Sequence, residues 1–214
     1  MHPMSKVWVF LLVICMPGIA MDRDADIVGS ALDPGSGSLL YREYHFCTED
    51  GMGCLVIYRD DMGLEIARKQ VDYRTGRRSP TISMRDSRTQ KVVVVKPDPE
   101  SVVDAGFDNF VRESWNLLER DGTLEFPFLV PGRDRPLNMQ ARTINGEACD
   151  GNVLCLQVRP RSWPLGLLVE PILLTYDREN RRLLRYQGVS NIRDAGGNMQ
   201  KVDIHYRYNA PAAG

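Results

Sequence analysis

The feature that most constrains the fold of this chain is a series of short segments in which apolar and polar residues alternate. Alternation with a period of two places successive side chains on opposite faces of a β-strand, and turn residues between the segments indicate antiparallel connections. We therefore predict a largely antiparallel meander. The predicted strands are 39–45, 55–59, 65–73, 81–84, 91–95, 123–130, 140–145, 154–159, 172–176, 183–190 and 201–208.

One long helix interrupts this series, from about Asp104 to Arg120. Asp104 is a suitable N-cap, and Asp121 followed by Gly122 is a suitable stop. Apolar residues recur along one face at helical spacing, which requires a concave apolar surface to receive them. The residues of this stripe are Phe107, Phe110, Val111, Trp115 and Leu118. A second, shorter helix is predicted to begin at Ser162, to contain Trp163 and Leu167, and to end before Pro171.

The N-terminus reads as a cleavable secretory signal. A short basic region up to Lys6 precedes the apolar run Val7 to Met16, and Gly18 and Ala20 supply the small residues that a signal peptidase requires. We predict a signal peptide over residues 1–20. The alternative is a lipoprotein signal with Cys15 acylated, although Ile14 stands where a small residue should precede that cysteine.

The rest of the chain is predicted to form one domain. A polar, Gly-rich segment over residues 21–38 is expected to be a flexible lead-in, 39–208 a single β-rich domain, and 209–214 a flexible tail. No later apolar run is long enough for a transmembrane helix, because Glu170 and Pro171 interrupt the longest one. We expect a soluble protein of the periplasm or the exterior. A net charge of −1 argues against nucleic acid as the main partner.

The cysteines predict disulfides. Four of the five lie outside the signal, in two sequence-local pairs, Cys47 with Cys54 and Cys149 with Cys155. An exported chain favours disulfide formation, and four cysteines permit three connectivities, of which we expect the local one. Zinc is a weaker alternative, because neither pair has the spacing of a zinc knuckle.

No motif indicates catalysis. His45 and His205 are the histidines outside the signal, and each lies in a predicted strand. The chain lacks a nucleophile elbow, a zinc-protease motif and a phosphate loop, so we expect no enzymatic activity, no cofactor and no metal. A hydrolase with a site that the sequence does not reveal remains a third, weaker hypothesis.

The bulky apolar residues of the two predicted helices are the more informative feature. They either fill the core beneath a curved sheet, or leave a cleft that takes an acyl chain or another hydrophobic small molecule. The candidate ligand-binding residues are Phe107, Phe110, Val111, Trp115, Leu118, Trp163 and Leu167.

The layout of signal, long meander, central amphipathic helix and returning hairpins resembles the bacterial lipoprotein-carrier fold, the LolA/LolB-like group. The resemblance spans Leu39 to Tyr208 and implies a sheet curved into an incomplete barrel around a helical lid. It rests on no diagnostic motif, so no functional residue is carried over. The segments Val103 to Asp108 and Tyr186 to Ile192 resemble those of exported bacterial proteins, which implies no activity.

Two functional hypotheses follow. The first is a non-enzymatic periplasmic protein that binds a lipid or other hydrophobic ligand in a cleft between sheet and helix. The alternative is an interaction or scaffolding module of the cell envelope with no ligand cavity. The sequence identifies no protein partner.

Overall fold

The computed structural model describes residues 24–130, 135–146, 149, 151–161 and 170–209. The expected signal peptide, the second predicted helix and most of the expected tail lie outside these residues. Within them, one large sheet of thirteen strands accompanies two short α-helices and a single turn of 3-10 helix.

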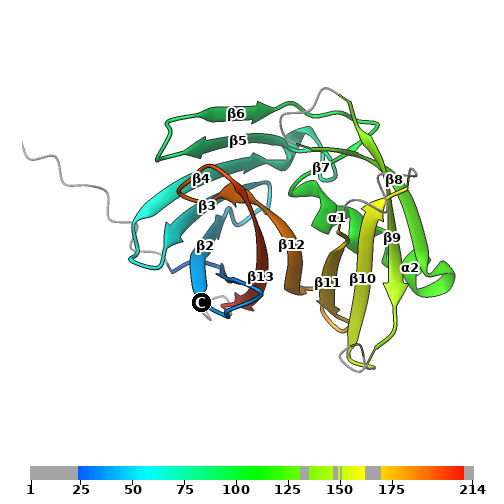
Figure 1. Cartoon of the computed structure of the whole chain (residues 1–214). Helices are drawn as coiled ribbons and strands as arrows, with labels where there is room; N and C mark the ends of the chain where they lie inside the picture. Colours follow the sequence, from blue (N-terminus) through cyan, green and yellow to red (C-terminus); the bar gives the residue numbers. More distant parts are fainter. Residues whose placement is uncertain (1–23, 131–134, 147–148, 150, 162–169, 210–214) are drawn as a thin grey trace, which may run out of the picture.

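The strands follow one another across the sheet in the order β6-β5-β4-β3-β2-β1-β13-β12-β11-β10-β9-β8-β7 (Figure 1). Their bounds are β1 Ile27–Leu32, β2 Leu39–Cys47, β3 Gly53–Asp60, β4 Glu65–Asp72, β5 Thr81–Asp86, β6 Val92–Val95, β7 Val102–Val103, β8 Thr123–Leu129, β9 Leu137–Ile144, β10 Val153–Pro160, β11 Ile172–Asp177, β12 Leu183–Arg193 and β13 Met199–Tyr208. All eleven predicted strands are confirmed, and β1 and β7 are additional.

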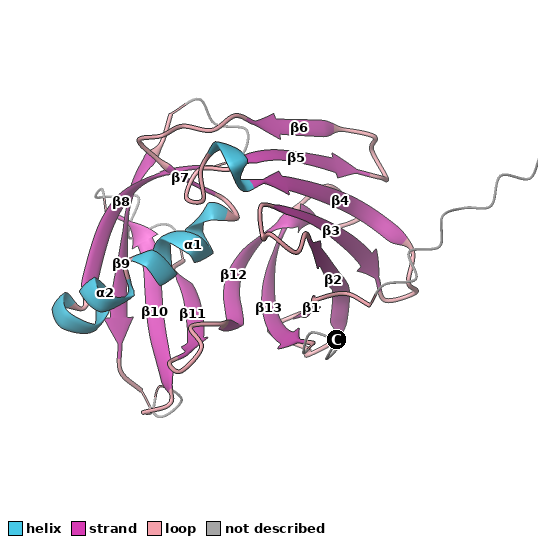
Figure 2. Ribbon diagram, turned by 180° about the vertical axis from the view of Figure 1, so that it is seen from behind, coloured by secondary structure: helices cyan, strands magenta, loops and turns pink. Residues whose placement is uncertain are grey.

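The sheet is open across the described chain, with β6 and β7 at its edges, and is not closed into a barrel. Neighbouring strands are antiparallel except β7 and β8, which are parallel. Two meanders, β1 to β6 and β8 to β13, are joined where β1 pairs with β13. The sheet curves, and the helices lie inside the curve over β8 to β11 (Figure 2).

The prediction of a flexible lead-in over residues 21–38 is wrong for the residues of β1. This strand lies in the middle of the sheet, between β2 and β13. This strand was not predicted because its six residues show little alternation of apolar and polar side chains. Gly29 lets β1 lie beside β13, because a Cβ at this position would be 2.9 Å from the Tyr206 ring.

The prediction of one long helix that begins at Asp104 is also wrong. The chain forms α1 Gly106–Glu113 and α2 Trp115–Asp121, interrupted at Ser114. Asp104 is not the N-cap: its φ is 35°, and its carboxylate forms an ion pair with Lys69. The predicted stop is confirmed, since Gly122 adopts a left-handed φ of 69° and its N–H donates to the Leu118 carbonyl. The apolar stripe continues across the interruption, which is why its period predicts a single helix.

The start of α1 is fixed against the loop between β4 and β5. A Cβ on Gly106 would lie 2.0 Å from the carbonyl oxygen of Arg78, so only glycine permits this approach. The same carbonyl accepts from the N–H of Val103 in β7 at 2.9 Å, and the Asn109 amide donates to the Arg77 carbonyl at 3.1 Å. These bonds hold the edge strand β7 against the opposite half of the sheet.

The core consists of three apolar groups. The largest lies between the helices and β8 to β12, the second on β1 to β4 with β12 and β13, and the third joins β4, β5, β6 and β7. The third group contains Val71, Ile82, Val95 and Val103. It therefore brings residues from both ends of the open sheet into contact.

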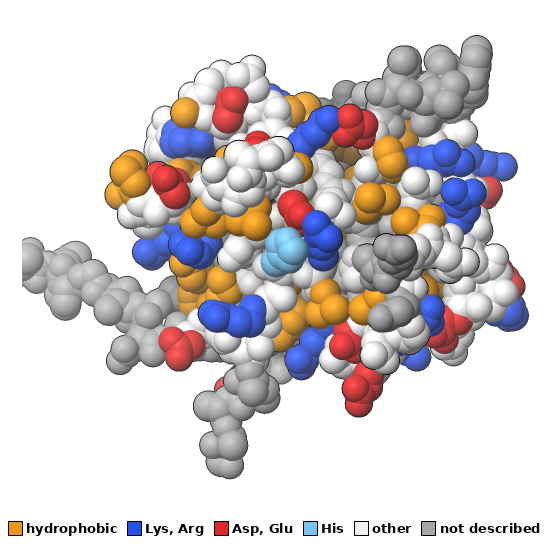
Figure 3. Space-filling view, turned by 60° about the horizontal axis from the view of Figure 1, so that its bottom comes forward, with side chains coloured by type: hydrophobic (Ala, Val, Ile, Leu, Met, Phe, Trp, Pro, Cys, Tyr) orange, Lys and Arg blue, Asp and Glu red, His pale blue; other side chains and the backbone are white. Residues whose placement is uncertain are grey.

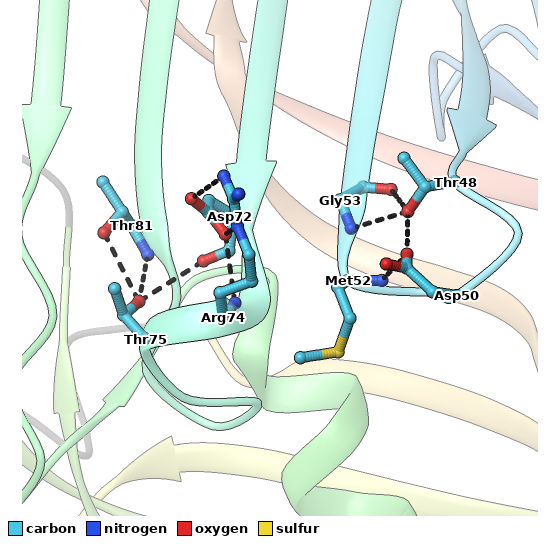
Figure 4. A network of polar contacts seen from close by, with 8 residues as sticks. All are labelled: Thr48, Asp50, Met52, Gly53, Asp72, Arg74, Thr75 and Thr81. Atoms are coloured by element: carbon cyan, nitrogen blue, oxygen red, sulfur yellow. Dashed lines mark hydrogen bonds and ion pairs between the residues drawn. The ribbon is translucent and has the colours of Figure 1, made fainter.

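Both expected disulfides are present. Cys47 and Cys54 are directly paired across β2 and β3, with their Cα atoms 4.0 Å apart, and Cys149 and Cys155 have Cα atoms 5.6 Å apart. The turn beside the first disulfide has its own polar network (Figure 4). Asp50 accepts from the Thr48 hydroxyl and the Met52 N–H, and the Gly53 N–H donates to Thr48 Oγ1 at 3.0 Å.

Replacing Cys54 by serine is expected to lower the free energy of unfolding by ~2–3 kcal/mol, because the disulfide closes a short loop. The β2–β3 turn keeps its hydrogen bonds, so the variant should still fold. Thermal unfolding followed by circular dichroism measures the effect, with Cys47→Ser/Cys54→Ser as the control for an unpaired thiol. An unchanged melting temperature in both variants would show that the crosslink does not stabilise the fold.

Candidate functional site

The apolar stripe of the helices is packed against the concave face of the sheet. The exposed fractions of Phe110, Val111, Trp115 and Leu118 are 7%, 0%, 2% and 1%. The Trp115 ring meets that of Tyr176 edge-on, with centroids 6.0 Å apart. The structure thus brings the predicted α-helical residues together in the core. Their role as ligand contacts stays a prediction, and Trp163 and Leu167 lie outside the described residues.

Phe107 differs from the rest of the stripe, because it is only partly buried and belongs to a group of four phenylalanines. Its ring centroid lies 5.4 Å from that of Phe126 and 6.2 Å from those of Phe110 and Phe128. Aromatic rings at these separations attract one another. The group joins α1 to β8.

Four partly exposed apolar side chains pack against the core near one end of strands β8, β9 and β11. We call this group the apolar rim, and its members are Phe107, Phe128, Leu137 and Ile172. Phe128 and Leu137 are paired across β8 and β9, and Ile172 begins β11. The rim packs against the core beneath the helices. In the sequence, the only signal of its strand residues is an apolar residue near the ends of β8, β9 and β11.

The other half of the concave face carries charged and phenolic groups. We call Glu43, His45, Lys69, Asp104 and Tyr206 the concave polar cluster. Glu43 Oε2 accepts from the Tyr206 hydroxyl at 3.2 Å and lies 3.2 Å from His45 Nε2. Lys69 Nζ lies 3.2 Å from Asp104 Oδ2, and the two side chains are 10% and 12% exposed. Charged side chains of both signs and hydrophobic side chains are interspersed on the face of the molecule seen in Figure 3.

The pKa directions show which protonation states these groups hold. Burial acts to lower the pKa of Lys69, but Asp104, Tyr58 and Glu43 outweigh it, so the pKa lies well above its ordinary value. Burial, followed by the charge of Glu43, raises the pKa of Tyr206 well above its ordinary value. At neutral pH Lys69 is therefore an ammonium group and Tyr206 a neutral phenol. Neither is activated as a nucleophile.

Two surface pockets meet the helix stripe only at Leu118. The larger, about 340 Å³, is bordered by the end of α2, Thr143, Arg178 and the Cys149–Cys155 disulfide. The smaller, about 210 Å³, lies between β8 and β9 beside Arg161. Leu118 borders the larger pocket, whereas Phe107, Phe110, Val111 and Trp115 border neither. In this structure the stripe faces packed side chains.

The described part of the chain has neither a metal-binding cluster nor a membrane-spanning helix. No group of three or more His, Cys, Asp or Glu side chains could hold a metal ion there. No helix in those same ranges has the length and apolar character needed to span a bilayer.

Comparison with known proteins identifies no family. No protein-family model matches the chain, and no curated protein matches it. Among solved structures, the chain is similar to a domain of a candidate outer membrane lipoprotein-sorting protein from Vibrio parahaemolyticus. The two are 12% identical, the match covers 86% of this chain and 83% of that chain, and the TM-score is 0.29. A likeness of this degree carries no argument about function.

Proposed function

We propose that this is a non-enzymatic, exported protein that binds a lipid or another ligand with a long apolar chain beside α1, on the concave side of the sheet. The observation that carries the proposal is the apolar rim, whose partly exposed side chains pack against the core between helices and sheet. The two disulfides support a location outside the cytoplasm, namely the periplasm or the exterior.

The short helix α1 makes this side of the molecule suitable for a ligand. A helix of eight residues is held by packing rather than by its own propensity. A ligand chain that offers equivalent apolar contact can take the place of Phe107 against Phe128 and Phe126. The ligand then replaces contacts that side chains of the stripe make with the sheet in this structure.

Quenching by a brominated fatty acid tests the proposal. In a variant with Trp8 and Trp163 both replaced by Phe, Trp115 is the remaining tryptophan. Bromine quenches tryptophan fluorescence at contact, so dibromostearate below its micelle concentration should quench Trp115 and unbrominated stearate should not.

A matched pair of variants locates the site. Leu137→Asp places a carboxylate in the rim and should weaken binding about tenfold or more, because it removes an apolar contact and desolvates a charge. Leu117→Asp on the outer side of α2, where Leu117 is 43% exposed, should leave binding unchanged. Equal affinities of the two variants, or no quenching at any concentration, would overturn the proposal.

The complete burial of Val111 and Trp115 favours the second candidate, an interaction module of the cell envelope with no ligand cavity. Native mass spectrometry of protein purified from its own compartment distinguishes the two. A carrier should hold co-purifying lipid, and its absence together with unquenched Trp115 would favour the module.

A further inference from the structure

Among the described residues, one edge strand of the sheet is covered by other parts of the chain and the other is not. β7 is fully buried, and its Val103 N–H donates to the Arg78 carbonyl, so this edge is covered. β6 pairs with β5 on one side, and its other side is free of any strand in both ribbon views (Figures 1 and 2). An uncovered edge is a template for pairing with a further strand.

The backbone of β6 presents hydrogen-bonding groups to solvent. The Asp86 N–H donates to the Lys91 carbonyl at 2.9 Å, and Val93 and Val95 are opposite Met84 and Ile82. Because hydrogen-bonded pairs alternate in an antiparallel ladder, the N–H and C=O groups of Val92 and Val94 point away from β5. In the described chain, no backbone partner on that side accepts from or donates to them.

The side chains at this edge are apolar and exposed. Val92 and Val94 are 54% and 59% exposed on the convex face, whereas Val93 and Val95 pack against the third apolar group. An added strand would bury part of the Val92 and Val94 side chains and form hydrogen bonds with their outward N–H and C=O groups.

Charge decides which strand fits. Lys91 and Lys96 flank β6, and both are exposed, as is Arg85 on β5. A second copy paired antiparallel on β6, with Val92 opposite Val94, would bring Lys91 of one copy within one position of Lys96 of the other at both ends. This accumulation of like charge disfavours self-pairing. Lysine at a strand edge is a recognised means of preventing such self-association. A segment with acidic ends is attracted instead.

We propose that the β6 edge binds an extended segment of a partner protein as a fourteenth strand, with apolar residues at alternate positions and an acidic residue at each end. Backbone bonds to Val92 and Val94 supply the affinity, and Lys91 and Lys96 select the charge. This site is independent of the proposed ligand face.

Titration of the ¹⁵N-labelled protein with two capped peptides tests the proposal. Glu-Thr-Val-Thr-Val-Glu should shift the amide resonances of Val92 and Val94, and Lys-Thr-Val-Thr-Val-Lys should bind at least about fivefold more weakly, as two exposed ion pairs allow. The double variant Lys91→Glu/Lys96→Glu should reverse this preference.

Val94→Pro removes the outward N–H while leaving the bonds to β5, since proline is tolerated at a strand edge. It should abolish the shifts, with the melting temperature confirming that the variant folds. Equal binding of both peptides, or unchanged binding by Val94→Pro, would refute the proposal. Dimerisation through β6 in sedimentation velocity would also overturn it, because the occupant would then be a second copy.

Discussion

Replacing Trp115 by alanine is expected to lower the free energy of unfolding by ~3–5 kcal/mol, as truncation of a buried aromatic side chain does. Trp115 is 2% exposed and contacts Tyr176, and the Arg181 guanidinium lies 5.5 Å from its ring centroid. The loss combines removed apolar contact with an unfilled cavity between α2 and β11. Chemical denaturation followed by far-UV circular dichroism measures it.

Leu117→Ala is the matched control, because Leu117 lies in the same helix with its side chain largely exposed. This variant should change stability by less than about 1 kcal/mol. A cost for Trp115→Ala close to that of the control would mean that the helix is loosely seated over a hydrated cleft. The packing described above would then be wrong.

Replacing Lys69 by methionine is expected to cost about 3–5 kcal/mol, because it leaves the Asp104 carboxylate buried without its partner. The two groups join β4 to the turn before α1 and are 35 residues apart in sequence. Their loss should therefore loosen the contact between the two halves of the sheet. Urea denaturation gives the change in free energy of unfolding.

The double variant Lys69→Met/Asp104→Asn removes the unpaired charge and should recover part of the loss. Asparagine is the suitable replacement because it tolerates the positive φ at this position. As a surface control, Arg120→Met breaks an exposed pair with Asp121 and should change stability by less than about 1 kcal/mol. If Lys69→Met costs as little as Arg120→Met, the Lys69–Asp104 pair does not stabilise the fold.

The candidate site was predictable in part. The helical stripe is visible in the sequence because its period depends on neighbouring residues alone, and the structure places Phe110, Val111, Trp115 and Leu118 in one cluster. Of the apolar rim only Phe107 was predicted, because Phe128, Leu137 and Ile172 come from three separate strands that local periodicity does not bring together. The concave polar cluster was missed for the same reason, since Glu43, Lys69 and Tyr206 lie on separate strands.

The local features of this protein follow from the pattern of neighbouring residues. Alternation located eleven strands, Gly122 ended the helical segment, and the short separations of the cysteines predicted their pairing. The tertiary structure decided the rest: β1 between β2 and β13, the interruption at Ser114, the open edge at β6 and the Lys69–Asp104 pair. Periodicity and turn residues report on a few consecutive positions. Strand order and buried charge pairs instead depend on which distant surfaces meet when the sheet curves.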